Sequence, residues 1–155
     1  MRIALVACLM AFAAAPALGA DIGAKNLYGR DPGLAPAYAC FATTFDAAWL
    51  KAHPAQNVTR LMVFAHRRVV DDAAWDSANL EMTFRDSKAT YHVTAECGGD
   101  NGTFGCGVDC EGGGFRMTAV STSTLGVTFD GYLRFYDTTD NPVDAPTAGF
   151  QPDDK

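Results

Sequence analysis

The chain has 155 residues, a length typical of one domain. With 48% hydrophobic and 19% charged residues, its composition excludes an intrinsically disordered protein. It carries 18 acidic against 12 basic side chains, and this balance speaks against a nucleic acid as the partner, because phosphate binding needs a basic surface.

The first twenty residues have the three parts of a secretory signal peptide. Met1 and Arg2 form a positive start, residues 3–15 are apolar, and Ala17–Ala20 offers small residues for cleavage. The apolar run is shorter than the ~20 residues of a membrane-spanning helix, so we expect no stable membrane insertion once it is removed. The exported chain, periplasmic or secreted, then has a net charge of −7, because only Arg2 is lost from the charged residues.

Two segments flank the expected domain. Residues 21–36 contain glycine and proline without periodicity, which predicts a flexible lead-in. Residues 137–155 hold five acids and three prolines, which predicts a mobile acidic tail. We therefore expect one folded domain over residues 37–136.

One short helix is predicted at about 44–53. Thr43 and Asp46 form a start that resembles a capping box, strong helix formers follow, and Pro54 ends the helix. The side chains at helical spacing, expected to dock on the rest of the domain, are Phe45, Trp49 and Leu50.

After Val58 much of the chain alternates between apolar and polar residues, which predicts strands. The expected strands are 58–70, 79–86, 89–97, 103–110, 115–121, 124–129 and 132–136. A sheet of about seven antiparallel strands hides its edges by closing on itself. The predicted fold is mainly β, an antiparallel meander closing into a small barrel or sandwich, with the helix packed at one end.

Turn positions predict the register of two hairpins. A two-residue turn at Ser87–Lys88 places Phe84 opposite Tyr91. A loop of the four residues before Phe115 places Cys110 opposite that phenylalanine. In both hairpins the apolar faces then coincide, as a core on one side of the sheet requires.

The strongest hairpin signal is Asn101–Gly102. It places Cys97 directly opposite Cys106, with α carbons ~4.5 Å apart, within reach of a disulfide. Four cysteines in an oxidising compartment predict two disulfides, and their spacing is not that of a zinc site. Cys110 lies ~13 Å from Cys106 along an extended strand, so it would pair with Cys40. That second bridge would close about 70 residues and be the more stabilising one.

Two runs, DAAWLKAHPAQNV (46–58) and CGVDCEGGGF (106–115), resemble segments of small exported bacterial proteins that form an uncharacterised family. The resemblance implies export and a fold held by disulfides. It implies no activity and no catalytic residues.

The expected register gathers charged side chains on the outer face of the sheet. These candidate binding residues are Glu81, His92, Asp109, Glu111 and Arg116. A histidine among carboxylates can hold a divalent cation or bind a basic partner. The same pattern is typical of a solvated sheet face with cross-strand ion pairs such as Asp109–Arg116. We assign no metal ion and no cofactor to it.

No catalytic motif stands out in the sequence. The three histidines are scattered, no G-x-S-x-G elbow is present, and the glycines of 98–114 lack the context of a phosphate-binding loop. We expect a non-catalytic binding protein of the cell envelope that meets another protein or a small ligand. The alternatives are a carrier of a divalent metal or small ligand, and a hydrolase with an unrecognised site. The negative charge predicts that an acidic surface meets any macromolecular partner, with binding that weakens as salt rises.

Overall fold

The structure is a computed structural model that describes residues 22–100, 102–136 and 142–143. Its helices are α1 (Ile22–Tyr28) and α2 (Ala47–Ala52). Its strands are β1 (Ala37–Thr44), β2 (Val58–Val70), β3 (Ala73–Phe84), β4 (Tyr91–Asp100), β5 (Thr103–Gly107), β6 (Gly113–Ser121), β7 (Thr124–Leu133), β8 (Phe135–Tyr136) and β9 (Pro142–Val143). The expected signal peptide lies outside the described residues, as does the expected tail apart from β9.

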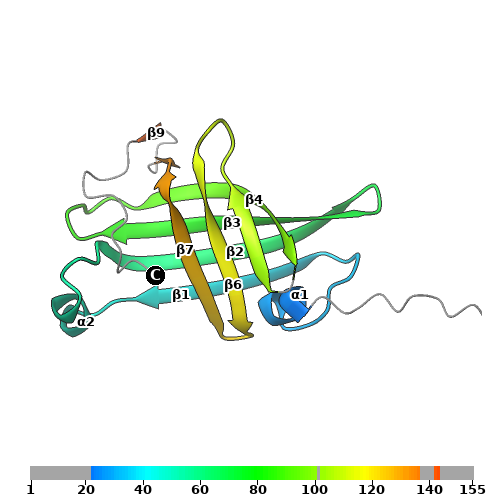
Figure 1. Cartoon of the computed structure of the whole chain (residues 1–155), viewed down its shortest axis with the longest axis horizontal. Helices are drawn as coiled ribbons and strands as arrows, with labels where there is room; N and C mark the ends of the chain where they lie inside the picture. Colours follow the sequence, from blue (N-terminus) through cyan, green and yellow to red (C-terminus); the bar gives the residue numbers. More distant parts are fainter. Residues whose placement is uncertain (1–21, 101, 137–141, 144–155) are drawn as a thin grey trace, which may run out of the picture.

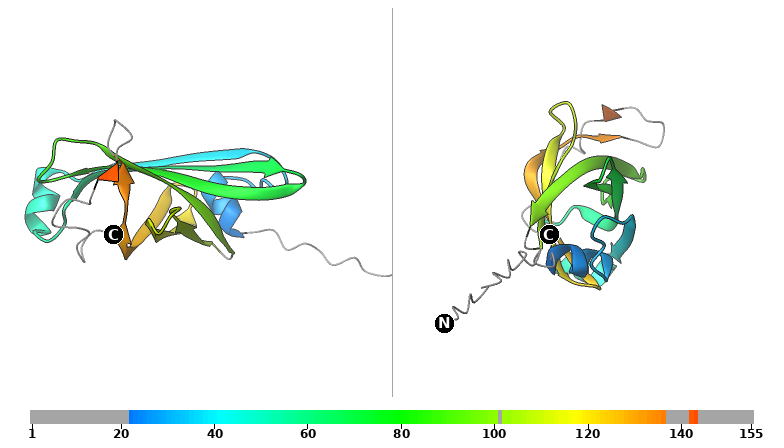
Figure 2. Two further views of the ribbon diagram at one scale, coloured as in Figure 1. Left: turned by 90° about the horizontal axis from the view of Figure 1, so that it is seen from above. Right: turned by 90° about the vertical axis from the view of Figure 1, so that its right-hand side faces the viewer.

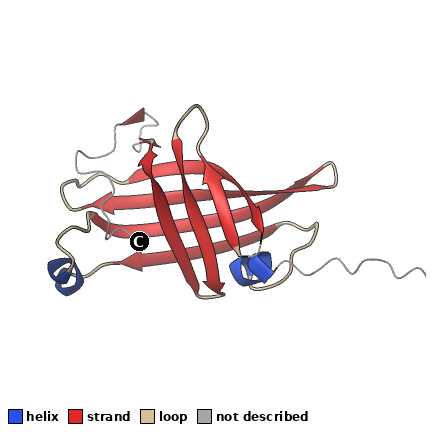
Figure 3. Cartoon of the chain, in the orientation of Figure 1, coloured by secondary structure: helices blue, strands red, loops and turns tan. Residues whose placement is uncertain are grey.

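The strands β1 to β7 are hydrogen-bonded in sequence order, each antiparallel to the next, and form a nearly closed barrel. In Figure 1, β5, β6 and β7 cross β1, β2 and β3 steeply, and Figure 2 shows the strands curving around a common interior. The two helices lie at opposite ends (Figure 3). The predicted antiparallel meander that closes into a small barrel is confirmed.

The strand bounds differ from the prediction in several places; among them, β4 extends to Asp100 and β5 already ends at Gly107. Strand β2 matches the prediction, but β1 was missed, and β3 begins at Ala73 because a tight turn at Asp71 and Asp72 joins it directly to β2. Both aspartates have positive φ, 49° and 60°, the conformation of a two-residue hairpin turn. The two last predicted strands are one continuous strand, β7, followed by the short β8.

The register of the β3–β4 hairpin differs from the prediction by two residues. Met82, rather than Phe84, lies opposite Tyr91, because residues 85–90 form a longer connection than the expected turn. Ser87 stabilises this connection by a hydrogen bond between its hydroxyl and the Tyr91 hydroxyl, at 2.9 Å. A shift of two leaves every side chain on its predicted face, so the core is unchanged.

The β5–β6 hairpin differs by four residues. Phe115 lies opposite Cys106, and the turn is at Cys110 and Glu111, whose φ values are 56° and 60°. Two of the glycines expected in the loop, Gly113 and Gly114, lie in β6 instead. A β carbon on Gly113 would lie 1.9 Å from the Tyr132 carbonyl oxygen, so only glycine allows β6 to approach β7 there.

One of the two predicted disulfides is present. Cys97 lies opposite Cys106, and the two are bonded with their α carbons 4.1 Å apart, as the Asn101–Gly102 turn predicts. The predicted Cys40–Cys110 bridge is wrong: both thiols are free and exposed. Cys40 is at an outward position of β1, and the left-handed turn removes Cys110 from the strand in which it was expected to face the core.

Helix α2 is shorter than predicted and is stabilised by hydrogen bonds from residues outside the helix. Asp46, not Thr43, caps its start, accepting a hydrogen bond from the Trp49 backbone at 2.7 Å. None of the residues of α2 itself is buried; of the expected docking face, Phe45 packs against the core just before the helix, whereas Trp49 and Leu50 do not. Instead the Arg85 guanidinium donates to the carbonyls of Leu50 and His53 at the end of the helix, at 2.6 and 2.8 Å.

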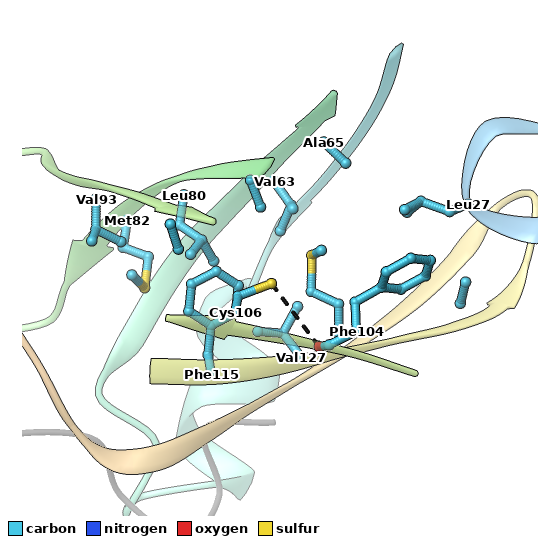
Figure 4. Close-up of a cluster of buried hydrophobic side chains, with 14 of the residues drawn as sticks. Leu27, Val63, Ala65, Leu80, Met82, Val93, Phe104, Cys106, Phe115 and Val127 are labelled. Atoms are coloured by element: carbon cyan, nitrogen blue, oxygen red, sulfur yellow. Dashed lines mark hydrogen bonds between the residues drawn. The ribbon is translucent and has the colours of Figure 1, made fainter. Parts of the chain in front are cut away.

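Helix α1 lies within the segment predicted to be a flexible lead-in, and that prediction is wrong. Ala24 and Leu27 are 0% and 2% exposed, and Asn26 donates to the Ala119 carbonyl at 3.2 Å. Figure 4 shows Leu27 directed toward the same interior as Phe104 and the other core side chains. The short helix closes one end of the barrel. No local pattern in its sequence predicts this packing.

A half-buried polar network holds helix α1 at this end of the barrel. The Tyr28 hydroxyl donates to Asp76 at 2.7 Å, and Asp76 also accepts two hydrogen bonds from Arg67, at 2.8 and 2.6 Å. Arg67 in turn donates to the Gly33 carbonyl and lies over the Tyr28 ring, 5.7 Å from its centroid. The network therefore ties α1 and the following loop to β2 and β3.

Burial, then the hydrogen bond to Asp76, raises the pKa of Tyr28 well above its ordinary value of 10.0. Above pH ~10 the unfolded phenol ionises while the folded one keeps its proton, so stability present below this pH is lost above it. We expect the free energy of unfolding to fall by up to about 1.4 kcal/mol per pH unit from this residue. Urea unfolding at pH about 9 and about 11 should show a smaller fall for Tyr28→Phe. An unchanged fall would contradict the assignment.

Candidate functional site

The structure brings together three of the five predicted binding residues. Glu81 on β3 lies directly opposite His92 on β4, and His92 shares the lining of a cavity of about 400 Å³ with Asp109. The His92 ring stacks on Tyr136 of β8, with the ring centroids 6.1 Å apart. These three residues form a connected strip on the outer surface.

The other two residues are not part of that strip. Glu111 occupies the β5–β6 turn, and Arg116 on β6 lies opposite Gly105 and Thr128. Asp109 and Arg116 are therefore not the cross-strand pair that the sequence predicted. The cause is the four-residue difference in register, which moves β6 along β5.

The charges of the strip do not build a metal site. Across the part of the chain that the structure describes, no group of three or more histidine, cysteine or acidic side chains is placed to hold a metal ion. Glu81 is ion-paired with Arg60 on β2, a contact between two partly exposed side chains. An exposed pair of this kind contributes little free energy, so the strip fits a solvated sheet face.

One serine and one histidine approach each other. The Ser77 hydroxyl lies 3.4 Å from Nε2 of His66, but Ser77 is only 6% exposed. Within the described residues Nδ1 of His66 has no hydrogen-bond partner, so no carboxylate orients the ring. A serine nucleophile needs both access and an oriented base, and the Ser77–His66 pair has neither.

A different surface has the features of a binding site. At the end of the sheet next to the β2–β3 turn, large apolar side chains stand on its outer face; we call Tyr38, Phe64, Val70 and Trp75 the aromatic end. Tyr38 is 66% exposed, Trp75 48% and Val70 49%. The Tyr38 and Phe64 rings stack with centroids 6.0 Å apart.

The register explains why these side chains gather. Tyr38 lies opposite His66, and Arg68, two positions further along β2, lies opposite Trp75. The Phe64 ring stacks on His66, with centroids 5.9 Å apart, so the aromatic rings of β1 and β2 form one continuous row. Their inward neighbours, such as Ala65 and Ala78, fill the barrel and force this row outward.

Beside Trp75 the surface is concave. A hollow of about 550 Å³ is lined by Arg68, Val70, Asp71, Ala73, Trp75 and Glu96. Arg68 and Glu96 form an exposed ion pair at 2.8 Å across it. With Asp71 and the neighbouring Asp72 exposed in the turn, carboxylates outnumber cations around the hollow. The aromatic end thus combines an apolar centre with an acidic rim.

The sequence contained one signal for this surface. Over residues 61–65 every side chain is apolar, whereas a strand with a solvated outer face alternates. The run lies in a predicted strand, to which it gives a second apolar face. The exposure of Trp75 has no such signal in the sequence, because the predicted strand begins only at residue 79.

None of the helices in the described parts of the chain has the length and apolar character needed to cross a membrane. Comparisons with protein-family models, curated proteins and solved structures found no match for this chain. The resemblance of the two runs at 46–58 and 106–115 to an exported family therefore stays a prediction.

Proposed function

We propose that this protein is a non-catalytic binding protein of the cell envelope, and that another protein docks on the aromatic end. The observation that carries the proposal is the joint exposure of Tyr38 and Trp75 on one face of the sheet. Three of the seven large apolar side chains exposed among the described residues lie at this end. Such a concentration is typical of a protein-binding surface, whereas single exposed apolar residues need no explanation.

The composition of the surface supports a protein partner. Tryptophan, tyrosine and arginine are the residue types that contribute most to binding energy at protein interfaces; here Arg68 lies opposite Trp75, and Tyr38 lies opposite His66, two positions before Arg68 on β2. The hollow beside Trp75 offers a pocket for a projecting side chain of the partner. A polar rim around an apolar centre is the usual arrangement of an interface.

The charged residues around the hollow indicate which kind of protein partner fits this surface. Asp71 and Glu96 line the hollow and Asp72 is exposed beside it in the turn, with Arg68 as the one cation that lines it among the described residues. A partner with a basic rim complements this surface, and its approach is accelerated by the opposite charge. This agrees with the expectation, drawn from the acidic composition, that binding weakens as salt rises.

The location in the envelope rests on two features. The first twenty residues have the pattern of a signal peptide, and a disulfide joins Cys97 to Cys106. Disulfides persist in oxidising compartments such as the periplasm and the exterior of the cell.

Photo-crosslinking in the producing cells tests the proposal. The full chain would carry p-benzoylphenylalanine in place of Tyr38 or, as a matched control, in place of Tyr132, which is 53% exposed on β7. We expect one discrete adduct from position 38 and none of that mass from position 132. The captured protein, once identified and purified, should bind the Trp75→Ala variant at least tenfold more weakly, since a central aromatic contributes ~2 kcal/mol or more.

Two results would contradict the proposal. The first is the same set of adducts from both positions, which indicates unspecific encounters. The second is binding of the purified partner that is unaffected by Trp75→Ala or by a rise in salt from about 0.05 M to about 0.5 M. Circular dichroism of each variant establishes that the fold is retained.

A further inference from the structure

The barrel has one open seam. Strands β1 and β7 are the two ends of the hydrogen-bonded path, so no ladder joins them. A cavity of about 480 Å³ lies in this seam, lined by Cys40, Phe41, Ala42, Thr43, Leu61, Val63, Thr122, Ser123, Thr124, Leu125 and Val127. It lies between β1 and the β6–β7 turn, and the residues of the aromatic end are not part of its lining.

The floor of this cavity is apolar and belongs to the interior of the barrel. Val63 and Val127 line it and are only 2% and 4% exposed. Phe41, Leu61 and Leu125 pack against the core but are only partly buried, so apolar surface remains open in the seam. Leaving such surface in water is unfavourable, at roughly 25 cal/mol for each Å².

The rim supplies hydroxyl groups and no charge. Thr43 on β1 and residues 122–124 of the β6–β7 turn line the cavity, and none of its lining residues is acidic or basic. An ionised group placed here would lose water without gaining a partner of opposite charge, which is costly. A neutral group can instead exchange hydrogen bonds with the hydroxyls.

We propose that the seam binds a small uncharged molecule with an apolar body and a hydrogen-bonding end. Its apolar body would lie on Phe41, Leu61 and Leu125, and its polar end would face the hydroxyls of the β6–β7 turn. The volume falls within the range of about 300–1,000 Å³ that is usual for small-molecule sites. The site is independent of the aromatic end, so either proposal can fail without the other.

Two dyes that differ by one charged group provide the first test. N-phenyl-1-naphthylamine is uncharged, and 1-anilinonaphthalene-8-sulfonate is the same molecule with a sulfonate. Titrated into the full chain, the uncharged dye should show a saturable one-to-one fluorescence rise and bind at least tenfold more tightly than the sulfonate. Equal affinity of the two dyes, or a rise that does not saturate, would overturn the proposal.

A cavity-filling variant locates the site. Leu125→Trp places a larger side chain in the seam and should weaken binding of the uncharged dye at least tenfold. The matched control is Val120→Trp, at a position 62% exposed, which should bind as the unchanged chain does. Equal loss of binding in both variants, with both folded, would overturn the proposal.

Thiol protection gives a measurement that needs no variant. Cys40 lines the cavity, whereas Cys110 lies in the β5–β6 turn, and both are free and exposed. With saturating uncharged dye, alkylation of Cys40 by N-ethylmaleimide, followed by mass spectrometry, should slow at least fivefold while that of Cys110 is unchanged. Unchanged alkylation of Cys40 would show that the dye does not bind in the seam.

Discussion

Replacing Asp76 with alanine should lower the free energy of unfolding by about 3–5 kcal/mol, the range found when one partner of a buried ion pair is removed. The side chains of Asp76 and Arg67 are 13% and 11% exposed, so the guanidinium would be left largely buried and without its carboxylate. Tyr28 would lose its acceptor as well. The network that holds α1 on the barrel would then be broken at its centre.

Equilibrium unfolding in urea measures this effect. The matched control is Glu96→Ala, which removes one partner of the exposed Arg68–Glu96 pair and should cost less than about 1 kcal/mol. Tyr28→Phe together with Asp76→Ala should cost less than the sum of the two single changes, because both remove the same hydrogen bond. Equal costs for Asp76→Ala and Glu96→Ala would contradict the importance of the network.

Removing the Cys97–Cys106 disulfide should cost about 2.5–3 kcal/mol, by the chain-entropy relation for a closed loop of about ten residues. The two positions are nine apart in sequence, and Cys106 is 4% exposed, so alanine at both positions also leaves a small loss of packing. Serine at Cys40 or at Cys110 should change stability by less than about 0.5 kcal/mol, because both side chains are exposed. This order reverses the one predicted from the sequence, in which the Cys40–Cys110 bridge was the more stabilising.

Non-reducing peptide mapping checks the connectivity directly. After alkylation of the native chain, Cys40 and Cys110 should carry the label, and Cys97 and Cys106 should be found in one linked peptide. A linked peptide that joins Cys40 to Cys110 would contradict the structure. Denaturant unfolding of the serine variants then distinguishes the free thiols from the bonded pair.

The sequence by itself determined the fold class and the register of the β4–β5 hairpin, although β5 ends at Gly107 rather than at residue 110. Alternation has a period of two, so errors of two and four residues left the paired residues of both hairpins on their predicted faces, whereas Cys110 left its strand for the turn. The Asn-Gly signal at 101–102 predicts one short connection, and Cys97 lies opposite Cys106 as that signal predicts. Local signals of this strength need no knowledge of the rest of the chain.

The candidate site could not be predicted in the same way. A charged patch depends on which residue faces which, and the turn at Cys110 and Glu111 pairs β6 with β5 four residues away from the predicted register. Arg116 and Glu111 were separated from His92 for that reason. The aromatic end depends on strands β1 and β3, of which the sequence predicted only the second half of β3.

Only the tertiary structure decided the position of helix α1 and the presence of the seam between β1 and β7. Helix α1 has seven residues, too few for independent stability, and forms because Ala24 and Leu27 are buried in the open end of the barrel. The seam arises because β1 and β7 meet without pairing, a consequence of the steep crossing of the two parts of the sheet. Burial and closure are properties of the whole molecule, so no local pattern of residues contains them.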